Sequence, residues 1–353
     1  MDDNGKPILI TGGSGFIASY LAMKFLEAGE QVVLFDRDPD LRRLTGYNNR
    51  YNNVRDQITF VQGDVSLLTH VLALFSKHEP KSVFHLGALL SAGADGNPTM
   101  GFEVDLVGSR NVFEAARIFC QQNNAPPVRV LFPSTIASFG RFIPGGNLVP
   151  NEAVQMPTTM YGVAKVATER LGEYYTSKGW IDFRAVRFPS VVGAARGPGG
   201  TTVYSTLMMQ APLQGKAYEA YVPADTRLDV IYVRDAVDAL RGLYNADPAK
   251  LVDQPTKTPR RVYNIAGIRI GDQAPQASDI EAAVKVKKPA AMISYNPNPI
   301  LTATVKSFGI LKDDAARTDW GWPGAQFDLT KTIDDFAQEV TQYPDRIKAI
   351  ELY

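Results

Sequence analysis

The chain has 353 residues, of which 45% are hydrophobic and 21% are charged, and its 37 basic residues balance 37 acidic ones. Zero formal net charge provides no electrostatic attraction for nucleic acid or for an anionic membrane surface. The single cysteine, Cys120, excludes an intramolecular disulfide, and three histidines beside it offer no zinc-ligand spacing. We therefore expect a cytoplasmic protein that binds no metal and no nucleic acid and crosses no membrane.

Short β-branched runs alternate with helical patterns through the first half of the chain. The predicted strands cover residues 7–10, 31–35, 58–61, 82–86 and 128–132. The predicted helices cover about 16–28, 66–75 and 99–121. This alternation predicts an α/β fold of the Rossmann type, a doubly wound parallel sheet with helices on both faces.

The second half is less regular and suggests a smaller C-terminal substrate lobe. A helix at 160–177 leads to a strand at 183–186, and the Gly-rich segment 192–200 reads as a loop. Helices are predicted at about 204–213 and 235–244, a surface insertion at 245–261, and a final helix capped by Asp328, with Ile333 and Phe336 on its apolar stripe. We expect a first domain of the Rossmann type over 1–160, completed by later segments that return to it. Residues 193–353 would mostly form the lobe, with the substrate in the cleft between the two.

A Gly-rich turn follows the first strand and opens a helix. Its spacing, G-x-x-G-x-x-A, places Gly12 and Gly15 where the backbone approaches a pyrophosphate closely, and Phe16 and Ile17 in the first helical turn. Asp36 ends the second strand, where a carboxylate accepts hydrogen bonds from the ribose hydroxyls. Because that carboxylate would repel a 2′-phosphate, the pattern favours NAD over NADP. The neighbouring Arg37 is the opposite signal, although a solvated turn residue is the simpler reading.

Beyond that turn the chain resembles the extended short-chain dehydrogenase/reductase family over nearly its whole length. The motifs that carry the resemblance are Gly63-Asp64-Val65, His85-Leu86-Gly87-Ala88, Leu131-Phe132-Pro133-Ser134-Thr135 and Tyr161-Gly162-Val163-Ala164-Lys165. The resemblance implies a catalytic Tyr161 and Lys165 and an upstream Ser or Thr, which counting back from Phe139-Gly140 assigns to Thr135, with Ser134 as its neighbour. It also implies further cofactor contacts at Asp64, Val65, Leu86, Gly87, Ala88, Pro189 and Val191.

The spacing of Tyr161 and Lys165 has a physical meaning of its own. At i and i+4 both side chains project from one face of a helix. A free tyrosine titrates near ~10, so a general base at neutral pH needs a cation nearby, and Lys165 is the candidate for lowering that pKa. Thr135 would hydrogen-bond the substrate oxygen. One residue departs from the family: Asp105 stands where an asparagine is usual, which changes the usual proton relay near Lys165.

Two positions distinguish the chain from the sugar-nucleotide epimerases of this family. Phe188, rather than asparagine, precedes Pro189, and Leu228 precedes Asp229, which leaves Arg227 one residue early for a diphosphate. Other stretches resemble the threonine 3-dehydrogenase and D-erythronate dehydrogenase branches, which oxidise a secondary alcohol of a short acid. A nucleotide-sugar epimerase or dehydratase is the alternative function, and a non-catalytic NAD-binding regulator is the second.

The same resemblance indicates where a substrate would bind. The substrate-binding candidates are Ser91, Thr135, Gly200, Thr201, Thr202 and Arg227. Threonine dehydrogenases usually carry an Asp after the paired threonines, a partner for the substrate ammonium, but here that residue is Val203. We therefore predict a hydroxy acid without an amino group, or weak use of threonine. Family members pair through two long helices, here about 99–121 and 160–177, so a homodimer is also expected.

Overall fold

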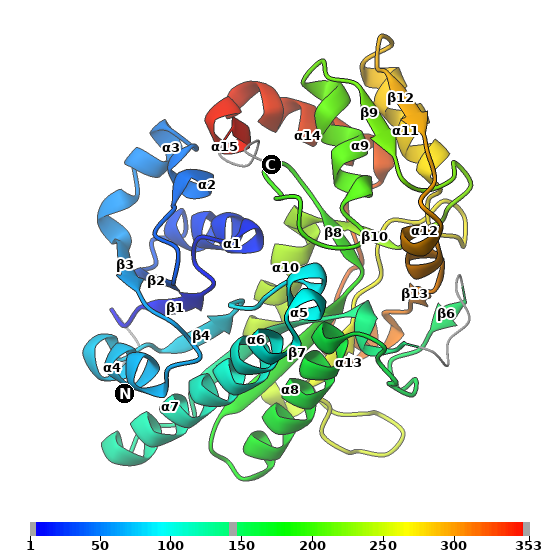
Figure 1. Ribbon diagram of the computed structural model, residues 1–353. Helices are drawn as coiled ribbons and strands as arrows, with labels where there is room; N and C mark the ends of the chain where they lie inside the picture. Colours follow the sequence, from blue (N-terminus) through cyan, green and yellow to red (C-terminus); the bar gives the residue numbers. More distant parts are fainter. Residues whose placement is uncertain (1–4, 141–146, 349–353) are drawn as a thin grey trace.

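A computed structural model describes residues 5–140 and 147–348 of the chain (Figure 1). Its centre is a seven-stranded sheet of order β11-β7-β5-β4-β1-β2-β3, in which every adjacent pair is parallel. The strands are β1 (Ile8–Thr11), β2 (Val32–Asp36), β3 (Ile58–Gln62), β4 (Ser82–His85), β5 (Arg129–Thr135), β7 (Asp182–Phe188) and β11 (Val262–Asn264). The predicted Rossmann-type α/β fold is confirmed.

Helices cover both faces of this sheet, as the alternation predicted. One face carries α4 (Leu68–His78), α7 (Gly108–Asn123) and α8 (Met160–Ser177), and the other carries α1 (Phe16–Leu26) and α10 (Val233–Asn245). Neighbouring strand residues alternate between the two cores: Ile8 and Ile10 pack on the α1 side, and Leu9 packs on the α4 side. The buried strands therefore read as continuous apolar runs.

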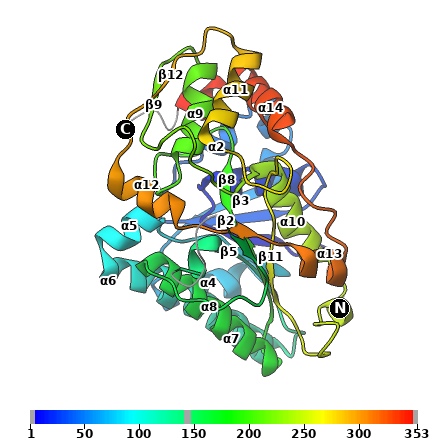
Figure 2. The ribbon, with the colours of Figure 1, turned by 90° about the vertical axis from the view of Figure 1, so that its right-hand side faces the viewer.

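The smaller lobe stands above the sheet, on the side away from α7 and α8 (Figure 2). Its helices are α9 (Tyr204–Leu213), α11 (Ala277–Lys287) and α14 (Leu329–Gln342), which pack on one another, beside the paired strands β9 (Tyr218–Ala220) and β12 (Ile293–Tyr295). A second pair, β8 (Ser190–Val192) with β10 (Val230–Tyr232), joins lobe and sheet. Because α10 and β11 return to the sheet, the two parts interleave along the chain.

Shorter elements complete the fold. They are α2 (Arg42–Thr45), α3 (Asn49–Asn52), α5 (Ser91–Gly96), α6 (Pro98–Gly101), α12 (Pro299–Lys306), α13 (Asp314–Trp320), α15 (Pro344–Lys348), β6 (Leu148–Val149) and β13 (Ile310–Leu311). The helix predicted over 99–121 is interrupted: α6 and α7 are joined by a π-helical segment, Phe102–Val107, which contains Asp105. At the other end of the chain Asp328 caps α14 as predicted, accepting the Lys331 N–H at 2.8 Å.

None of the helices within residues 5–140 and 147–348 has the length and apolar character that crossing a bilayer requires.

Candidate active site

A cavity of about 640 Å³ runs from the Gly-rich turn, across the carboxyl ends of the strands, to the loop at 197–202. Nearly all of the sequence-predicted site residues line it. They are Gly12, Gly15, Phe16, Ile17, Asp36, Arg37, Asp64, Val65, Leu86, Gly87, Ala88, Ser91, Thr135, Tyr161, Lys165, Pro189, Val191, Gly200, Thr201 and Thr202. The topology places the cavity where ligands bind in such sheets, at the crevice between β1 and β4, where the strand order reverses.

The Gly-rich turn has the geometry of a phosphate cradle. Gly12 has φ +68°, and a Cβ there would lie 2.7 Å from the backbone nitrogen of Gly87. The helix α1 begins after Gly15 with no side-chain cap, so its first N–H groups face the cavity with the positive end of the helix dipole. Both features fit a dinucleotide pyrophosphate.

A carboxylate stands beside this cradle at the end of β2. Asp36 accepts the Ser14 N–H at 3.1 Å and the Asp38 N–H at 3.1 Å, which hold the side chain at the cavity wall. Arg37 is exposed at the same end. Sequence reasoning missed Arg43, which lines the cavity and donates to the carbonyl oxygens of Ser14 (3.3 Å) and Ala195 (3.1 Å). These residues fit the adenosine half of NAD.

The helix α8 supplies Tyr161 and Lys165 to the opposite end of the cavity. Thr159 caps this helix through its Oγ1, which accepts the Gly162 N–H at 3.0 Å. Lys165 is 3% exposed, and its Nζ donates to the carbonyl oxygen of Pro133 at 2.8 Å. Burial lowers the pKa of Lys165 to about 8, against the opposing charges of Asp105 and Glu169. Burial thus brings the pKa of Lys165 closer to the physiological range and still leaves the group mostly protonated at neutral pH.

The electrostatics of Tyr161 differ from the expectation. Burial raises its pKa above the ordinary value, the negative charge of Asp105 raises it further, and the positive charge of Arg196 lowers it. We expected Lys165 to lower this pKa, but its ammonium is directed to the Pro133 carbonyl and lies 5.3 Å from the Tyr161 ring centroid. The cation that favours the phenolate is therefore Arg196, which comes from a loop far along the chain.

The hydroxyls of Ser134 and Thr135 have different surroundings. Ser134 Oγ donates to Glu169, a fully buried carboxylate that also binds Arg187 at 2.8 Å. Thr135 lines the cavity, and among residues 5–140 and 147–348 its Oγ1 has one hydrogen-bond partner, the Ala137 N–H at 3.2 Å. Its own O–H is therefore available to a ligand, which favours Thr135 over Ser134 for the hydroxyl role.

A buried hydrogen-bond chain runs behind the catalytic end. Ser109 Oγ donates to the carbonyl oxygen of Asp105 at 2.5 Å, so His85 Nε2 must donate to Ser109 Oγ at 3.0 Å, and His85 Nδ1 accepts from Thr11 Oγ1 at 2.7 Å. Burial and the Lys165 charge lower the pKa of His85 to about 3, which keeps the ring neutral at physiological pH. This series of hydrogen bonds therefore has a structural role: it connects β1, β4 and the π-helical segment.

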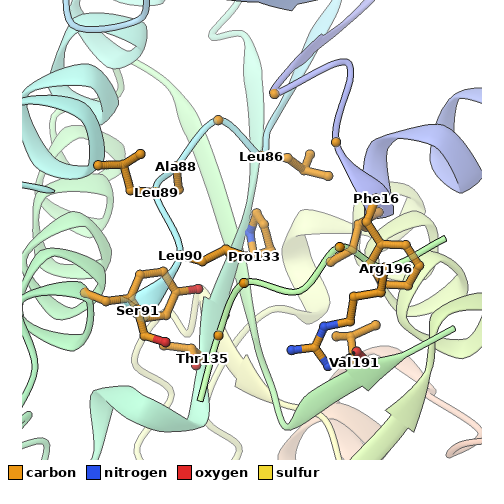
Figure 3. A pocket seen from close by; sticks show the side chains of 18 of the residues that line it. Phe16, Leu86, Ala88, Leu89, Leu90, Ser91, Pro133, Thr135, Val191 and Arg196 are labelled. Atoms are coloured by element: carbon orange, nitrogen blue, oxygen red, sulfur yellow. Dashed lines mark hydrogen bonds between the residues drawn. The ribbon is translucent and has the colours of Figure 1, made fainter. Parts of the chain in front are cut away.

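The substrate-side candidates are brought together with one exception. Ser91 begins α5, and Thr202 Oγ1 lies 2.7 Å from Ser190 Oγ (Figure 3 shows Ser91 and Thr135 across the cavity from Arg196). Arg227 does not line the cavity. Its Nη1 donates to the Ala274 carbonyl at 2.7 Å, and its backbone forms an isolated bridge with Gln276. The loop at 192–200 provides Arg196 instead. The one sequence feature that could have indicated Arg196 is that it is the single charged residue in a run of small residues.

Comparisons with known proteins identify chains of similar sequence and fold. A family model described as NAD dependent epimerase/dehydratase family matches residues 8–266. The mitochondrial L-threonine 3-dehydrogenase of Bos taurus is 30% identical over 336 residues, 92% of this chain and 80% of that protein. The holo form of a GalE-like L-threonine dehydrogenase from Cupriavidus necator is 29% identical with a TM-score of 0.81, over 95% of this chain and 99% of that one. An L-threonine dehydrogenase from Clostridium difficile is 28% identical with a TM-score of 0.80, over 98% and 99%.

Proposed function

The chain belongs to the NAD dependent epimerase/dehydratase family, and from that premise we propose that it oxidises the secondary alcohol of a short hydroxy acid that carries no amino group. Family membership confirms the resemblance found in the sequence and NAD as the cofactor, and the chain is an NAD-dependent dehydrogenase of the extended short-chain type. The observation that carries the proposal is the shared cavity: Thr135, Tyr161 and Lys165 line the same space as the dinucleotide cradle.

We assign the three catalytic candidates the roles that the resemblance implies; burial and Asp105 raise the pKa of Tyr161 and oppose its role as base, and the Arg196 charge favours it. Thr135 donates its free O–H to the substrate oxygen, and Tyr161 takes the proton of the alcohol. NAD⁺, which the Gly-rich turn and Asp36 would hold, would supply the hydride acceptor for the carbon that bears the alcohol, so that the products would be a ketone, the reduced cofactor and one proton. Lys165, whose Nζ is held by the Pro133 carbonyl and lies 5.3 Å from the Tyr161 ring centroid, keeps a positive charge on the same side of the cavity.

The charges along the cavity support a substrate without an ammonium group. The carboxylates that line it, Asp36, Asp38 and Asp64, belong to the cofactor end. At the other end, the loop residues Gly200, Thr201 and Thr202 line the cavity, and the next residue, Val203, is buried and carries no charge. An ammonium brought there would lose its hydration without a carboxylate to replace it, which is costly.

A panel of substrates tests the proposal directly. Purified protein is mixed with NAD⁺ and threonine, lactate, 3-hydroxybutyrate or erythronate, and NADH formation is followed at 340 nm. We expect at least one of the three hydroxy acids to be oxidised faster than threonine. Preferred turnover of threonine would contradict the substrate assignment, whereas NAD that stays bound through purification, with no absorbance change on any acid, would favour an epimerase.

We also propose that two copies pair through the α6–α8 layer. Met100 (38% exposed), Phe102 (44%) and Val163 (44%) leave large apolar side chains uncovered there. The segments that carry them pack on one another, so these side chains belong to one helical layer. Light scattering at micromolar concentration should give the mass of two chains, and Phe102→Glu should halve it. A wild-type mass of one chain would refute the pairing.

A further inference from the structure

Arg196 is a cation inside the cavity whose hydrogen bonds all go to neutral oxygens. Its Nη1 donates to the Val191 carbonyl at 2.8 Å and to Ser190 Oγ at 3.2 Å, with a longer contact to Thr206 Oγ1 at 3.4 Å. Its Nη2 reaches Thr202 Oγ1 at 3.4 Å. Within residues 5–140 and 147–348, no carboxylate lies at ion-pairing distance from this guanidinium. Three hydroxyls and a carbonyl orient the group without neutralising it.

Arg196 is half-buried, and the arginines that are buried in the described part of the fold each have a carboxylate partner. Arg184 is paired with Asp182 at 2.8 Å, Arg187 with Glu169 at 2.8 Å, and Arg346 with Glu339 at 2.7 Å. Burial lowers the pKa of Arg196 to about 10, which still leaves it protonated at neutral pH. A half-buried charge without a counter-ion is available to bind an incoming anion.

The guanidinium also lies at the catalytic end of the cavity. Its charge acts on the Tyr161 hydroxyl, and Figure 3 shows it pointing into the cavity from the side opposite Ser91 and Thr135. An anionic group bound there would place the rest of a short molecule between Arg196 and Thr135. The hydroxyl to be oxidised would then meet Tyr161.

We propose that Arg196 binds the carboxylate of the substrate and thereby selects short hydroxy acids over neutral alcohols and over amino acids. This inference rests on the proposed function and adds to it the residue that recognises the acid. A planar carboxylate accepts two parallel N–H donors of a guanidinium, and the hydroxyls of Ser190 and Thr202 hold that guanidinium in place. The same positive charge repels a substrate ammonium, so Arg196 and Val203 act in the same direction.

A binding measurement tests the inference separately from turnover. The protein is saturated with NADH, which forms a complex that cannot oxidise an alcohol, and the change in NADH fluorescence is titrated with lactate, 3-hydroxybutyrate and erythronate. Each acid is compared with its methyl ester, which removes the negative charge and keeps the hydroxyl. Wild-type protein should prefer at least one acid to its ester. Arg196→Gln should abolish that preference, weakening the acid by about 30-fold or more while changing the ester little.

Two further variants complete the test. Arg170→Gln removes an exposed positive charge on α8 and should leave the preference unchanged, whereas Arg196→Lys keeps the charge without the paired donors and should retain a weaker preference. If Arg196→Gln does not bind NADH, the Arg196→Lys variant is used in its place. If Arg196→Lys then binds the acid as tightly as the wild type does, the inference is overturned. A wild-type protein without any acid preference, or an Arg196→Gln variant that keeps it, also overturns it. A third outcome separates the two proposals. If Arg196→Gln removes the preference for the acid but the wild type oxidises no acid, the role of Arg196 is supported and the proposed oxidation is refuted.

Discussion

Burial disfavours the charged form of the Asp105 carboxylate, and the Asp105→Asn variant measures the free energy that this costs the folded protein. The side chain is 3% exposed, its Oδ1 accepts the Leu89 N–H at 2.6 Å, and its Oδ2 is buried with no hydrogen-bond partner among the described residues. Burial raises the pKa of Asp105 to about 6 from an ordinary value of 3.8, although the Lys165 charge and the Leu89 N–H both lower it.

The size and sign of the effect follow from that shift. Because the folded pKa lies above the unfolded one, the stability contributed by this group is fully present below pH 3.8 and is lost as the pH rises through about 6. The rise in the pKa of Asp105 from 3.8 to about 6 corresponds to about 3 kcal/mol of unfolding free energy, and roughly half of that contribution is lost between pH 5 and pH 8. The asparagine side chain of the variant cannot titrate, and its oxygen can still accept the Leu89 N–H.

Urea unfolding of the two proteins between pH 4 and pH 8 checks this reasoning. The stability of Asp105→Asn relative to wild type should rise by about 2–3 kcal/mol across that range, while any offset from repacking stays constant with pH. Parallel stability curves would refute it. The variant should also move the acid limb of the kcat/KM profile to lower pH, because Asp105 raises the pKa of Tyr161.

Three more substitutions test separate parts of the site. Tyr161→Phe should lower kcat by about 10²–10⁴-fold with little change in NADH affinity, and retention of more than about a tenth of the wild-type rate would remove Tyr161 from the role of base. Asp36→Ala should raise the KM for NAD⁺ and relax discrimination against NADP⁺, whereas equal wild-type efficiency with both cofactors would contradict its role. Glu169→Gln leaves the buried Arg187 without a counter-charge and should cost about 3–5 kcal/mol in urea unfolding. Glu173→Gln, which removes the half-exposed partner of the surface residue Arg170, should cost less than about 1 kcal/mol; similar losses would show that the Glu169 pair is not the cause.

Much of the fold and of the cofactor end could be predicted because the signals there are local. The Gly-rich turn has to follow a strand and open a helix, and Asp36 ends the next strand, so each position is set by its neighbours in the chain. The helix predicted over 160–177 forms with those bounds as α8, which by itself puts Tyr161 and Lys165 on one face. Parallel strand pairing then brings these segments to one edge of the sheet.

The substrate end depends on contacts between segments far apart in sequence, and there sequence patterns were weaker guides. Arg227, expected in the site, donates instead to the Ala274 carbonyl, and the loop at 193–200 places Arg196 at the cavity. The π-helical turn at Asp105 likewise has no periodicity that marks it in advance. The sequence by itself determined the sheet, the cradle and the Tyr161–Lys165 pair, because short-range geometry positions them. The packing of the lobe against the sheet determines which arginine faces the cavity hydroxyls of Thr135 and Tyr161, because the direction of a loop side chain depends on the surfaces that enclose it.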